Sequence, residues 1–243
     1  MTKSMSKTKV DLLGDRLRKG SFTEADLRLL DEYRRSFRTE YDTVIQVIRV
    51  QLGFEPTGRP AKSTSSIVEK LERETIRLSQ MQDIAGCRIV VDDVVVQERD
   101  IATLRRAFPE MTVVDRRVNP SHGYRAVHLV VRIEDKLIEV QLRTKLQHHW
   151  AELSEKLSDV FDPAIKYGGG EGEIRTTLLK ASDAVASWEA LENRLVTLPR
   201  NAKNTSKIQE IEEAIVAARA NLLAMFTDAL AILDEGQEDD LSD

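Results

Sequence analysis

The sequence predicts an α/β (α+β) fold, with a β-sheet in the middle of the chain and helices at both ends. Short apolar runs with alternating polar residues lie between residues 85 and 143, which is typical of strands. Apolar residues recur at helical spacing before residue 52 and after residue 172. The 243 residues are 41% hydrophobic and 32% charged, which is enough apolar material for a sizeable core in a soluble globule.

The N-terminal part is expected to be helical. A helical stripe predicts one long amphipathic helix over residues 24–52, and the loop "GFEPTGRPAKSTS" ends it. A second helix is expected to begin near Ser66, where Ser66 and Glu69 fit a capping box, and to run through "IVEKLERETIRL". The long helix is predicted from Leu27, Leu30, Tyr33, Phe37, Tyr41, Val44, Ile45 and Ile48.

The middle of the chain alternates strands and helices. The segment "CRIVVD" predicts a buried strand, residues 95–108 a helix, and "MTVVDRRV", "AVHLVVRI" and "LIEVQLR" three further strands. A helix over residues 145–161 follows, and beyond "YGGGEGE" two more are expected over 173–196 and 205–233. We therefore expect three regions: N-terminal helices (1–55), an α/β core (56–168), and C-terminal helices with an acidic tail (169–243).

The last predicted helix carries a wide apolar stripe. A single neighbouring helix would not need so wide a stripe, so we expect it to pack against residues 173–196 and against a second subunit in a homo-oligomer. The alternative is packing wholly on its own domain. The stripe comprises Ile208, Ile211, Ile215, Ala218, Leu222, Met225, Ala229 and Ile232, widened by Leu223, Phe226, Leu230 and Leu233.

Charge, cysteine content and apolar runs argue against a nucleic-acid binder and against a secreted or membrane-spanning protein. A net charge of −5 argues against a generic nucleic-acid binder, although six acidic and no basic side chains lie in the tail "DEGQEDDLSD". Cys87 is the only cysteine, so no intrachain disulfide is possible, which suits a reducing compartment. The N-terminus lacks the apolar core of a signal peptide, and no apolar run approaches membrane-spanning length. We expect a cytoplasmic protein without a membrane partner.

The predicted hairpin at residues 126–143 places polar side chains on one face. A short turn at "EDK" would set Glu139 opposite Arg132 and Arg143 opposite His128, with Gln141 on the same face. A solvent-facing sheet surface explains this pattern, and so does a metal-binding Glu139 supported by Gln141 and Arg143.

Asp83, in "DIAGCRIVV", stands just before a buried strand that contains Arg88. An acidic residue at a strand edge is often only a turn residue. Mg²⁺, however, prefers one or two carboxylates together with substrate phosphate oxygens. Asp83 and Glu139 are therefore the candidate pair for Mg²⁺.

The segment "GRPAKSTSSIVEK" is basic and precedes a helix. If the helix begins near Ser63, Lys62, Ser66 and Lys70 share one face near its positive end, which favours phosphate, and Arg59 precedes them. A solvated basic face is the alternative. The segment is not a P-loop, because GxxxxGK[ST] is absent.

The loop "NPSHGYRAVH" combines a glycine with an aromatic residue. Gly123 allows close backbone approach, and Tyr124 can stack on a base or pack the loop against its own sheet. The histidines in "QHHWAEL" do not form HExxH, and no Cys/His cluster has zinc spacing.

These motifs, in this order, resemble the synthetase domain of the RelA/SpoT family of alarmone synthetases over about residues 58–166. The diagnostic segments are "EVQLRT" and "HHWAE". The resemblance implies a mixed sheet related to nucleotidyltransferases. It also implies transfer of the β,γ-pyrophosphate of ATP to the 3′-hydroxyl of GDP or GTP, giving ppGpp or pppGpp.

The resemblance also implies roles for individual residues. Asp83 and Glu139 resemble the Mg²⁺ carboxylates, with Glu139 also the base for the 3′-hydroxyl. The residues expected on the ATP side are Arg59 (on the adenine), Lys62, Ser66, Lys70 and Arg88. Those expected on the acceptor nucleotide are His122, Tyr124 (on the guanine), His128, Gln141 and Arg143.

The sequence departs from the family pattern at two places. One extra residue separates Arg59 from Ser66-Ile67, and "NPSHGY" lacks the lysine of Pro-Lys-x-Asn-Gly-Tyr and has His122 in the asparagine position. The 243 residues leave no room for the hydrolase and regulatory domains of the long members, so the resemblance leads us to expect a small, synthetase-only member. Two alternatives stay open: a toxic relative that modifies another 3′-hydroxyl, of tRNA or of an adenosine nucleotide, and a degenerate nucleotide-binding domain.

Overall fold

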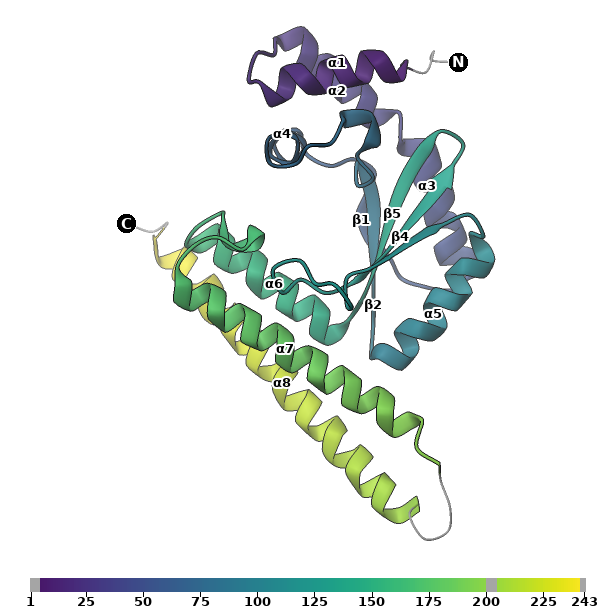
Figure 1. The fold of residues 1–243 in the computed structure, drawn as a ribbon, viewed down its shortest axis with the longest axis vertical. Coiled ribbons are helices and arrows are strands. Elements are labelled where there is room, and N and C mark those ends of the chain that lie inside the picture. The colour runs from purple at the N-terminus through teal and green to yellow at the C-terminus, as the bar shows by residue number, and fades with distance from the viewer. Residues whose placement is uncertain (1–4, 200–204, 241–243) are drawn as a thin grey trace. The chain divides into compact units, whose positions relative to one another are not determined.

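The computed structural model describes residues 5–199 and 205–240, and the side chains up to residue 234. A five-stranded sheet lies in the order β1-β2-β5-β4-β3, and helices flank it, so the predicted α+β fold is confirmed (Figure 1). The strands are β1 (Thr57–Arg59), β2 (Ala85–Val91), β3 (Thr112–Asp115), β4 (Val127–Ile133) and β5 (Lys136–Thr144).

Strand β2 alternates strictly between buried and half-buried residues, as expected of a strand with one face on a core. β1 lies antiparallel beside it, with Gly58 opposite Cys87. The strands approach so closely here that a Cβ on Gly58 would lie 2.6 Å from the Cα of Cys87. Cys87 is a buried free thiol, and burial raises its pKa to about 12. β1 lies inside the segment that the sequence predicted to be a loop.

The single long helix predicted over residues 24–52 is wrong. The chain forms α2 (Glu24–Arg35), α3 (Arg38–Gln46) and a π-helical turn (Val47–Gln51), after a first helix α1 (Lys7–Arg18). The break occurs at Ser36, whose hydroxyl donates to the carbonyl of Tyr33 at 2.7 Å. Tyr33 and Phe37 stay buried on either side of it, with ring centroids 5.2 Å apart, so the apolar spacing continues across the break.

Helix α4 (Thr64–Arg73) begins earlier than expected. Its N-cap is Ser63, whose hydroxyl accepts from the backbone N–H of Ser66, so the predicted capping box of Ser66 and Glu69 is wrong. Serine at both positions made the two caps indistinguishable by residue type. Helix α5 (Val94–Ala107) and helix α6 (Lys145–Val160) match the expected ranges closely. Short 3₁₀ turns occupy Leu78–Gln80 and Ile165–Tyr167.

The C-terminal part consists of α7 (Gly172–Val196) and α8 (Thr205–Asp240), which lie side by side and pack against α6 (Figure 1). Their core contains Trp150 and Leu146 of α6, Leu178 and Val185 of α7, and Phe226 of α8. Helix α8 continues to Asp240, so residues 234–240 of the acidic tail are helical. Residues 241–243 lie outside the described part.

The sequence-based statement that no apolar run approaches membrane-spanning length also needs correction. Residues Thr205–Asp234 of α8 meet that criterion by length and composition, with a mean hydropathy of 1.5 in one window. The same helix buries Phe226 in the C-terminal core, and its Arg219 pairs with Asp93 and Glu192. A packed helix of a folded unit can meet the same criterion. The cytoplasmic location stays a prediction.

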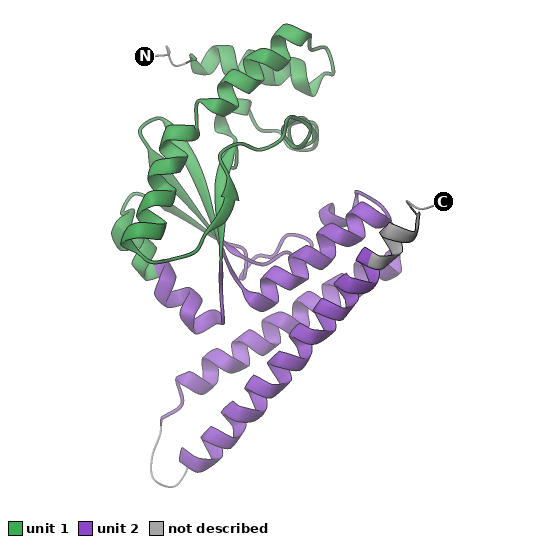
Figure 2. Ribbon diagram, turned by 180° about the vertical axis from the view of Figure 1, so that it is seen from behind, with its two compact units in different colours: residues 1–89, 102–114, 128–141 green, residues 90–101, 115–127, 142–243 purple. Residues whose placement is uncertain are grey.

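The chain divides into two compact units, coloured separately in Figure 2. Unit 1 comprises residues 1–89, 102–114 and 128–141, and unit 2 comprises residues 90–101, 115–127 and 142–243. The three regions expected at 1–55, 56–168 and 169–243 stay a prediction.

Candidate active site

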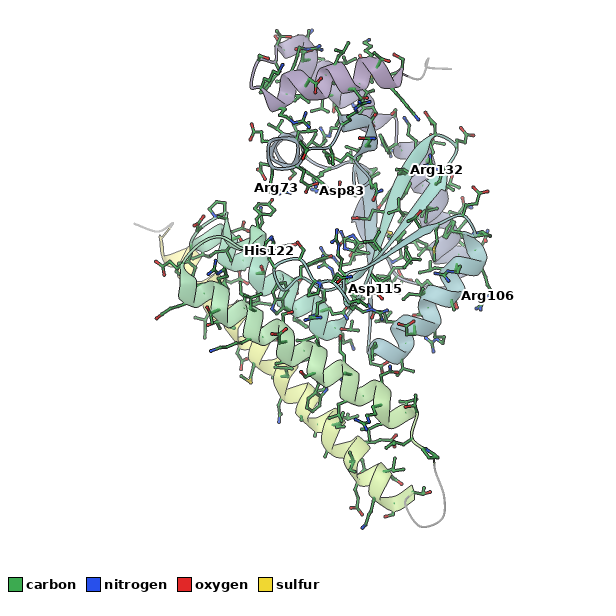
Figure 3. The ribbon with its side chains drawn as sticks, viewed as in Figure 1. Arg73, Asp83, Arg106, Asp115, His122 and Arg132 are labelled. Carbon is green, nitrogen blue, oxygen red and sulfur yellow. The ribbon has the colours of Figure 1, made fainter. Side chains whose placement is uncertain are left out.

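In unit 1, two ammonium groups meet one carboxylate. Lys62 Nζ lies 2.6 Å from Asp83 Oδ2, and Lys70 Nζ lies 2.8 Å from Asp83 Oδ1. Lys62 directly precedes the Ser63 cap of α4, Lys70 follows two turns into that helix, and Asp83 precedes β2 (Figure 3). The Lys62 backbone fixes this arrangement, because its N–H donates to the carbonyl of Ile84 at 2.6 Å.

The two lysines control the ionisation of Asp83. Burial by itself would raise the pKa of this carboxyl group, but the charges of Lys70 and Lys62 and their hydrogen bonds outweigh it. The pKa of Asp83 is therefore lowered, and the group is an anion at neutral pH. All three side chains are largely buried, so solvent screens their interaction only weakly.

Glu139 of β5 is held in the same unit by two neighbours. His128 Nδ1 lies 2.7 Å from Glu139 Oε1, and Gln141 Nε2 donates to Glu139 Oε2 at 2.8 Å. Burial would raise the pKa of Glu139, but the hydrogen bond and charge of His128 and the amide of Gln141 lower it below its usual value. The negative charge of Asp83 acts in the opposite direction, so the two carboxylates interact electrostatically.

On the neighbouring strand β4, the side chain that is hydrogen-bonded to Glu139 is His128, whereas the sequence-based pairing set Arg132 opposite Glu139. The strands leave only Glu134 and Asp135 between them, and counting along both strands from this turn sets Val130 opposite Glu139. His128 is then the diagonal neighbour, within reach of a long side chain. The expected sharing of one face by His128, Glu139 and Gln141 is confirmed by their hydrogen bonds.

Gly86 explains how β2 and β5 come together beside this carboxylate. A Cβ at Gly86 would lie 2.6 Å from the Glu139 carbonyl oxygen, so a larger residue would push the strands apart. Glycine in "DIAGCR" is therefore required by the close approach of two backbones.

The remaining residues predicted on the ATP side lie on β1, α4 and β2. Arg59 is exposed on β1 opposite Gly86, and Arg88 is half-buried on β2 opposite Thr57. The hydroxyl of Ser66 accepts a hydrogen bond from Ser63 Oγ at 2.7 Å, so it belongs to the helix cap in this structure. The nucleotide-binding roles of all three stay predictions.

In unit 2, the loop before β4 makes a tight turn at His122 and Gly123. Both have positive φ, 53° and 89°, and Ser121 and Tyr124 exchange backbone hydrogen bonds across them. This is the pattern of a type I′ turn. His122 is labelled in Figure 3. Its ring packs on Gly168, where an added Cβ would clash with the imidazole. His122 was expected on the acceptor nucleotide, and that role stays a prediction.

Tyr124 and Arg143 form a pair within unit 2. Arg143 Nη2 donates to Tyr124 Oη at 3.0 Å, and the guanidinium carbon lies 5.0 Å from the ring centroid. Arg143 is almost fully buried and Tyr124 is half-buried against the core of α6, α7 and α8. Both sequence-based alternatives for Tyr124 thus keep support, because one ring can pack on its own unit and still expose a surface for a base.

Sequence analysis missed three residues that hold this loop. Arg125, Ser182 and Glu189 are hydrogen-bonded around the Tyr124–Arg143 pair, and two of them come from α7. The sequence offered one signal for two of them: Ser182 and Glu189 are polar, lie seven residues apart, and therefore share one face of the predicted helix.

The donor set of unit 1 fits a hard divalent cation. Over the described residues, 5–199 and 205–240, no group of three or more His, Cys, Asp and Glu side chains gathers that could hold a metal on protein ligands alone. Asp83 and Glu139 supply oxygen donors and interact electrostatically. Two carboxylates completed by phosphate oxygens and water are the usual set for Mg²⁺.

Comparison with known proteins identifies relatives of this domain. A family model described as a region found in RelA / SpoT proteins matches residues 58–158. An uncharacterized protein of Mycobacterium tuberculosis is 38% identical over 112 residues, which cover 44% of this chain and 41% of that protein. The chain thus spans about two fifths of the length of the mycobacterial relatives. GTP pyrophosphokinase YjbM of Bacillus subtilis is 34% identical over 149 residues, covering 54% of this chain and 65% of that protein.

Solved structures of a small alarmone synthetase also resemble this chain. The crystal structure of small alarmone synthetase 1 from Bacillus subtilis superposes with a TM-score of 0.52 at 28% identity, covering 71% of this chain and 96% of that one. A structure of that protein bound to its product pppGpp gives 0.50 at 25% identity, covering 71% and 97%.

Gly123→Ala should destabilise unit 2. An alanine at φ 89° is strained by about 1–2 kcal/mol, and its Cβ would lie 2.7 Å from the ring of Trp150. Gly172→Ala, at the start of α7, is the matched control, since its Cβ would meet no atom within 4 Å. It should be neutral or stabilise by about 0.5–1 kcal/mol. Urea unfolding of both variants checks this, and equal midpoints would contradict it.

Proposed function

We propose that this chain, whose residues 58–158 match the model of a region found in RelA / SpoT proteins, is a synthetase of that family and transfers the β,γ-pyrophosphate of ATP to the 3′-hydroxyl of GDP or GTP. The observation that carries the proposal is the cluster of Lys62, Lys70 and Asp83 together with Glu139. It combines cations for a polyphosphate, oxygen donors for a metal, and an ionised carboxylate that can accept a proton. The Bacillus subtilis relative named as a GTP pyrophosphokinase supports the same reaction.

The reaction requires an attack on the β-phosphorus of ATP. The 3′-oxygen of the acceptor forms a bond to this phosphorus, the bond to the α,β-bridging oxygen breaks, and AMP leaves. The hydroxyl proton passes to Glu139, which is ionised and is held in position by His128 and Gln141. Such a transfer needs alignment and charge neutralisation more than covalent chemistry.

Mg²⁺ is the proposed cofactor, with Asp83 and Glu139 as its protein ligands. When bound, it would neutralise charge on the phosphate oxygens and orient them for in-line displacement. Lys62 and Lys70 would then exchange part of their interaction with Asp83 for phosphate oxygens, which charge-assisted hydrogen bonds favour. Arg59, Ser66 and Arg88 complete the proposed ATP side.

The acceptor nucleotide is proposed to stack on Tyr124. Arg143 orients the tyrosine ring through its hydroxyl, and stacking on an aromatic face tolerates any base. His122, His128 and Gln141 are the other proposed acceptor contacts. The solved relative bound to pppGpp supports a guanosine acceptor.

A labelling assay tests the function directly. The purified chain is incubated with γ-labelled ATP and Mg²⁺, and GDP, GTP, adenosine nucleotides or bulk tRNA are offered separately. Labelled ppGpp or pppGpp is expected. Label on tRNA or on an adenosine nucleotide alone would replace the proposal with the toxic-relative alternative, and no transfer to any acceptor would favour the degenerate domain.

Removing either metal carboxylate should abolish transfer. Asp83→Asn and Glu139→Gln keep the side-chain shape but remove the charge, so product formation should fall by orders of magnitude while the unfolding transition persists. Glu134→Gln, in the turn of the same hairpin, should retain full activity because its carboxylate is exposed. Near-normal turnover of either site variant in Mg²⁺ would remove that residue from the mechanism.

Two further substitutions should separate the substrates. Tyr124→Ala should weaken binding of the acceptor nucleotide by about 1–3 kcal/mol, because the base of that nucleotide loses its stacking partner. The KM for ATP should stay nearly unchanged, since ATP is not proposed to stack on Tyr124. Lys62→Ala and Lys70→Ala should chiefly raise the KM for ATP. Arg73→Ala, at the exposed end of α4, is the control. Equal shifts in both Michaelis constants would contradict the assignment.

Helix α8 is proposed to contact a second copy of the chain. Ile211, Met225 and Ile232 are spaced by multiples of seven on one face and are 47%, 68% and 69% exposed. Apolar side chains in such a row are typical of helix–helix interfaces.

Light scattering at micromolar concentration should therefore give a mass above the 27.5 kDa of one chain. Met225→Glu should lower it to the monomer value, because a charge cannot be buried unpaired. A wild-type monomer would contradict the homo-oligomer, and sedimentation with lipid vesicles would assign the row to a membrane.

A further inference from the structure

Helix α7 carries buried polar side chains outside the matched region of residues 58–158. Ser182 is 1% exposed and Glu189 is 6% exposed, although the helix otherwise buries apolar residues such as Leu178 and Val185. A buried hydroxyl or carboxylate lowers stability unless its hydrogen bonds are made, so each must be explained by its partners.

Ser182 holds the loop that carries Tyr124. Its hydroxyl donates to the Gly123 carbonyl at 2.6 Å and accepts from Arg125 Nε at 2.9 Å. Arg125 also donates to the Arg117 carbonyl at 2.7 Å, within the same unit. The residues on both sides of Tyr124 are therefore attached to one side chain of α7.

Glu189 holds the other half of the pair, two helical turns further along. Its carboxylate accepts from Thr144 Oγ1 at 2.5 Å and from Gln147 Nε2 at 2.9 and 3.0 Å. Thr144 is the N-cap of α6 and directly follows Arg143. Because Arg143 contacts the Tyr124 hydroxyl, one face of α7 supports both members of the Tyr124–Arg143 pair.

We propose that α7 positions the acceptor nucleotide, with Ser182 as the residue that orients Tyr124 and Glu189 as the residue that orients Arg143. This rests on the proposed function for the identity of the ligand, a guanosine 5′-phosphate stacked on Tyr124. Neither residue touches the nucleotide in this proposal; each acts through the backbone next to the residue that does. The ATP-side lysines bond Asp83 within unit 1, so loss of Ser182 should change the acceptor step selectively.

The test compares Ser182→Ala with Ser187→Ala on the same helix. The Ser187 hydroxyl donates only to the Asp183 carbonyl and is exposed, so its loss should change nothing. For Ser182→Ala we expect a rise of about tenfold in the KM and in the calorimetric Kd for GDP, since a buried acceptor and donor lose their partner. The KM for ATP should stay unchanged. Backbone amides of residues 121–125 should exchange hydrogen faster without ligand.

The outcomes that overturn the proposal are distinct from failure of the proposed function. A Ser182→Ala protein that unfolds at lower temperature but binds GDP like the wild type would make α7 merely structural. If Ser182→Ala does not fold, Arg125→Lys, which loses the Nε donor to Ser182, must show the same selective loss. If the wild type modifies no nucleotide, the proposed function fails, while unchanged hydrogen exchange at residues 121–125 would still disprove the role of Ser182.

Discussion

The buried contact of Asp83 with two lysines is the constraint on which the rest of unit 1 depends. An isolated carboxylate at this depth would be driven to the neutral form, and two ammonium groups without it would repel each other. The carboxylate and both ammonium groups can pair only if Lys62 precedes the cap of α4, Lys70 lies two turns into that helix, and Asp83 lies just before β2. The cap at Ser63, the glycine at position 86 and the short strand β1 all keep these elements close together.

The residues that share one face of a strand could be predicted from the sequence, because the apolar periodicity indicates which side of the strand is buried. The alternation in β5 placed Glu139 and Gln141 on one face, and their hydrogen bond confirms it. Periodicity does not report where a helix breaks: Tyr33 and Phe37 keep helical spacing across Ser36, so two helices looked like one. It also cannot fix the register of a hairpin, which depends on a turn of two residues at Glu134 and Asp135.

The supporting role proposed for α7 could not be predicted from the sequence, for a different reason. Ser182 and Glu189 are single polar residues in a helix of 25 residues, and nothing in their immediate neighbours distinguishes them from solvated positions. Their partners, Gly123 and Thr144, lie more than 40 residues away in the chain. The seven-residue spacing of Ser182 and Glu189 places both on one helix face, but it does not indicate which distant residues they contact. For this reason the sequence indicated candidate residues around Asp83 and Glu139, but not the helix that holds Tyr124 and Arg143.

The single thiol of Cys87 has a practical consequence. Buried on β2, with a pKa of about 12, it offers almost no thiolate to an alkylating reagent at neutral pH. The natural chain is therefore close to a cysteine-free background for labelling chemistry. A cysteine introduced at an exposed position of either unit would carry a fluorophore or spin label alone, without first replacing a residue in the sheet. Motions of the loop at His122 or of the α8 surface thus become accessible to spectroscopy in the otherwise unaltered protein.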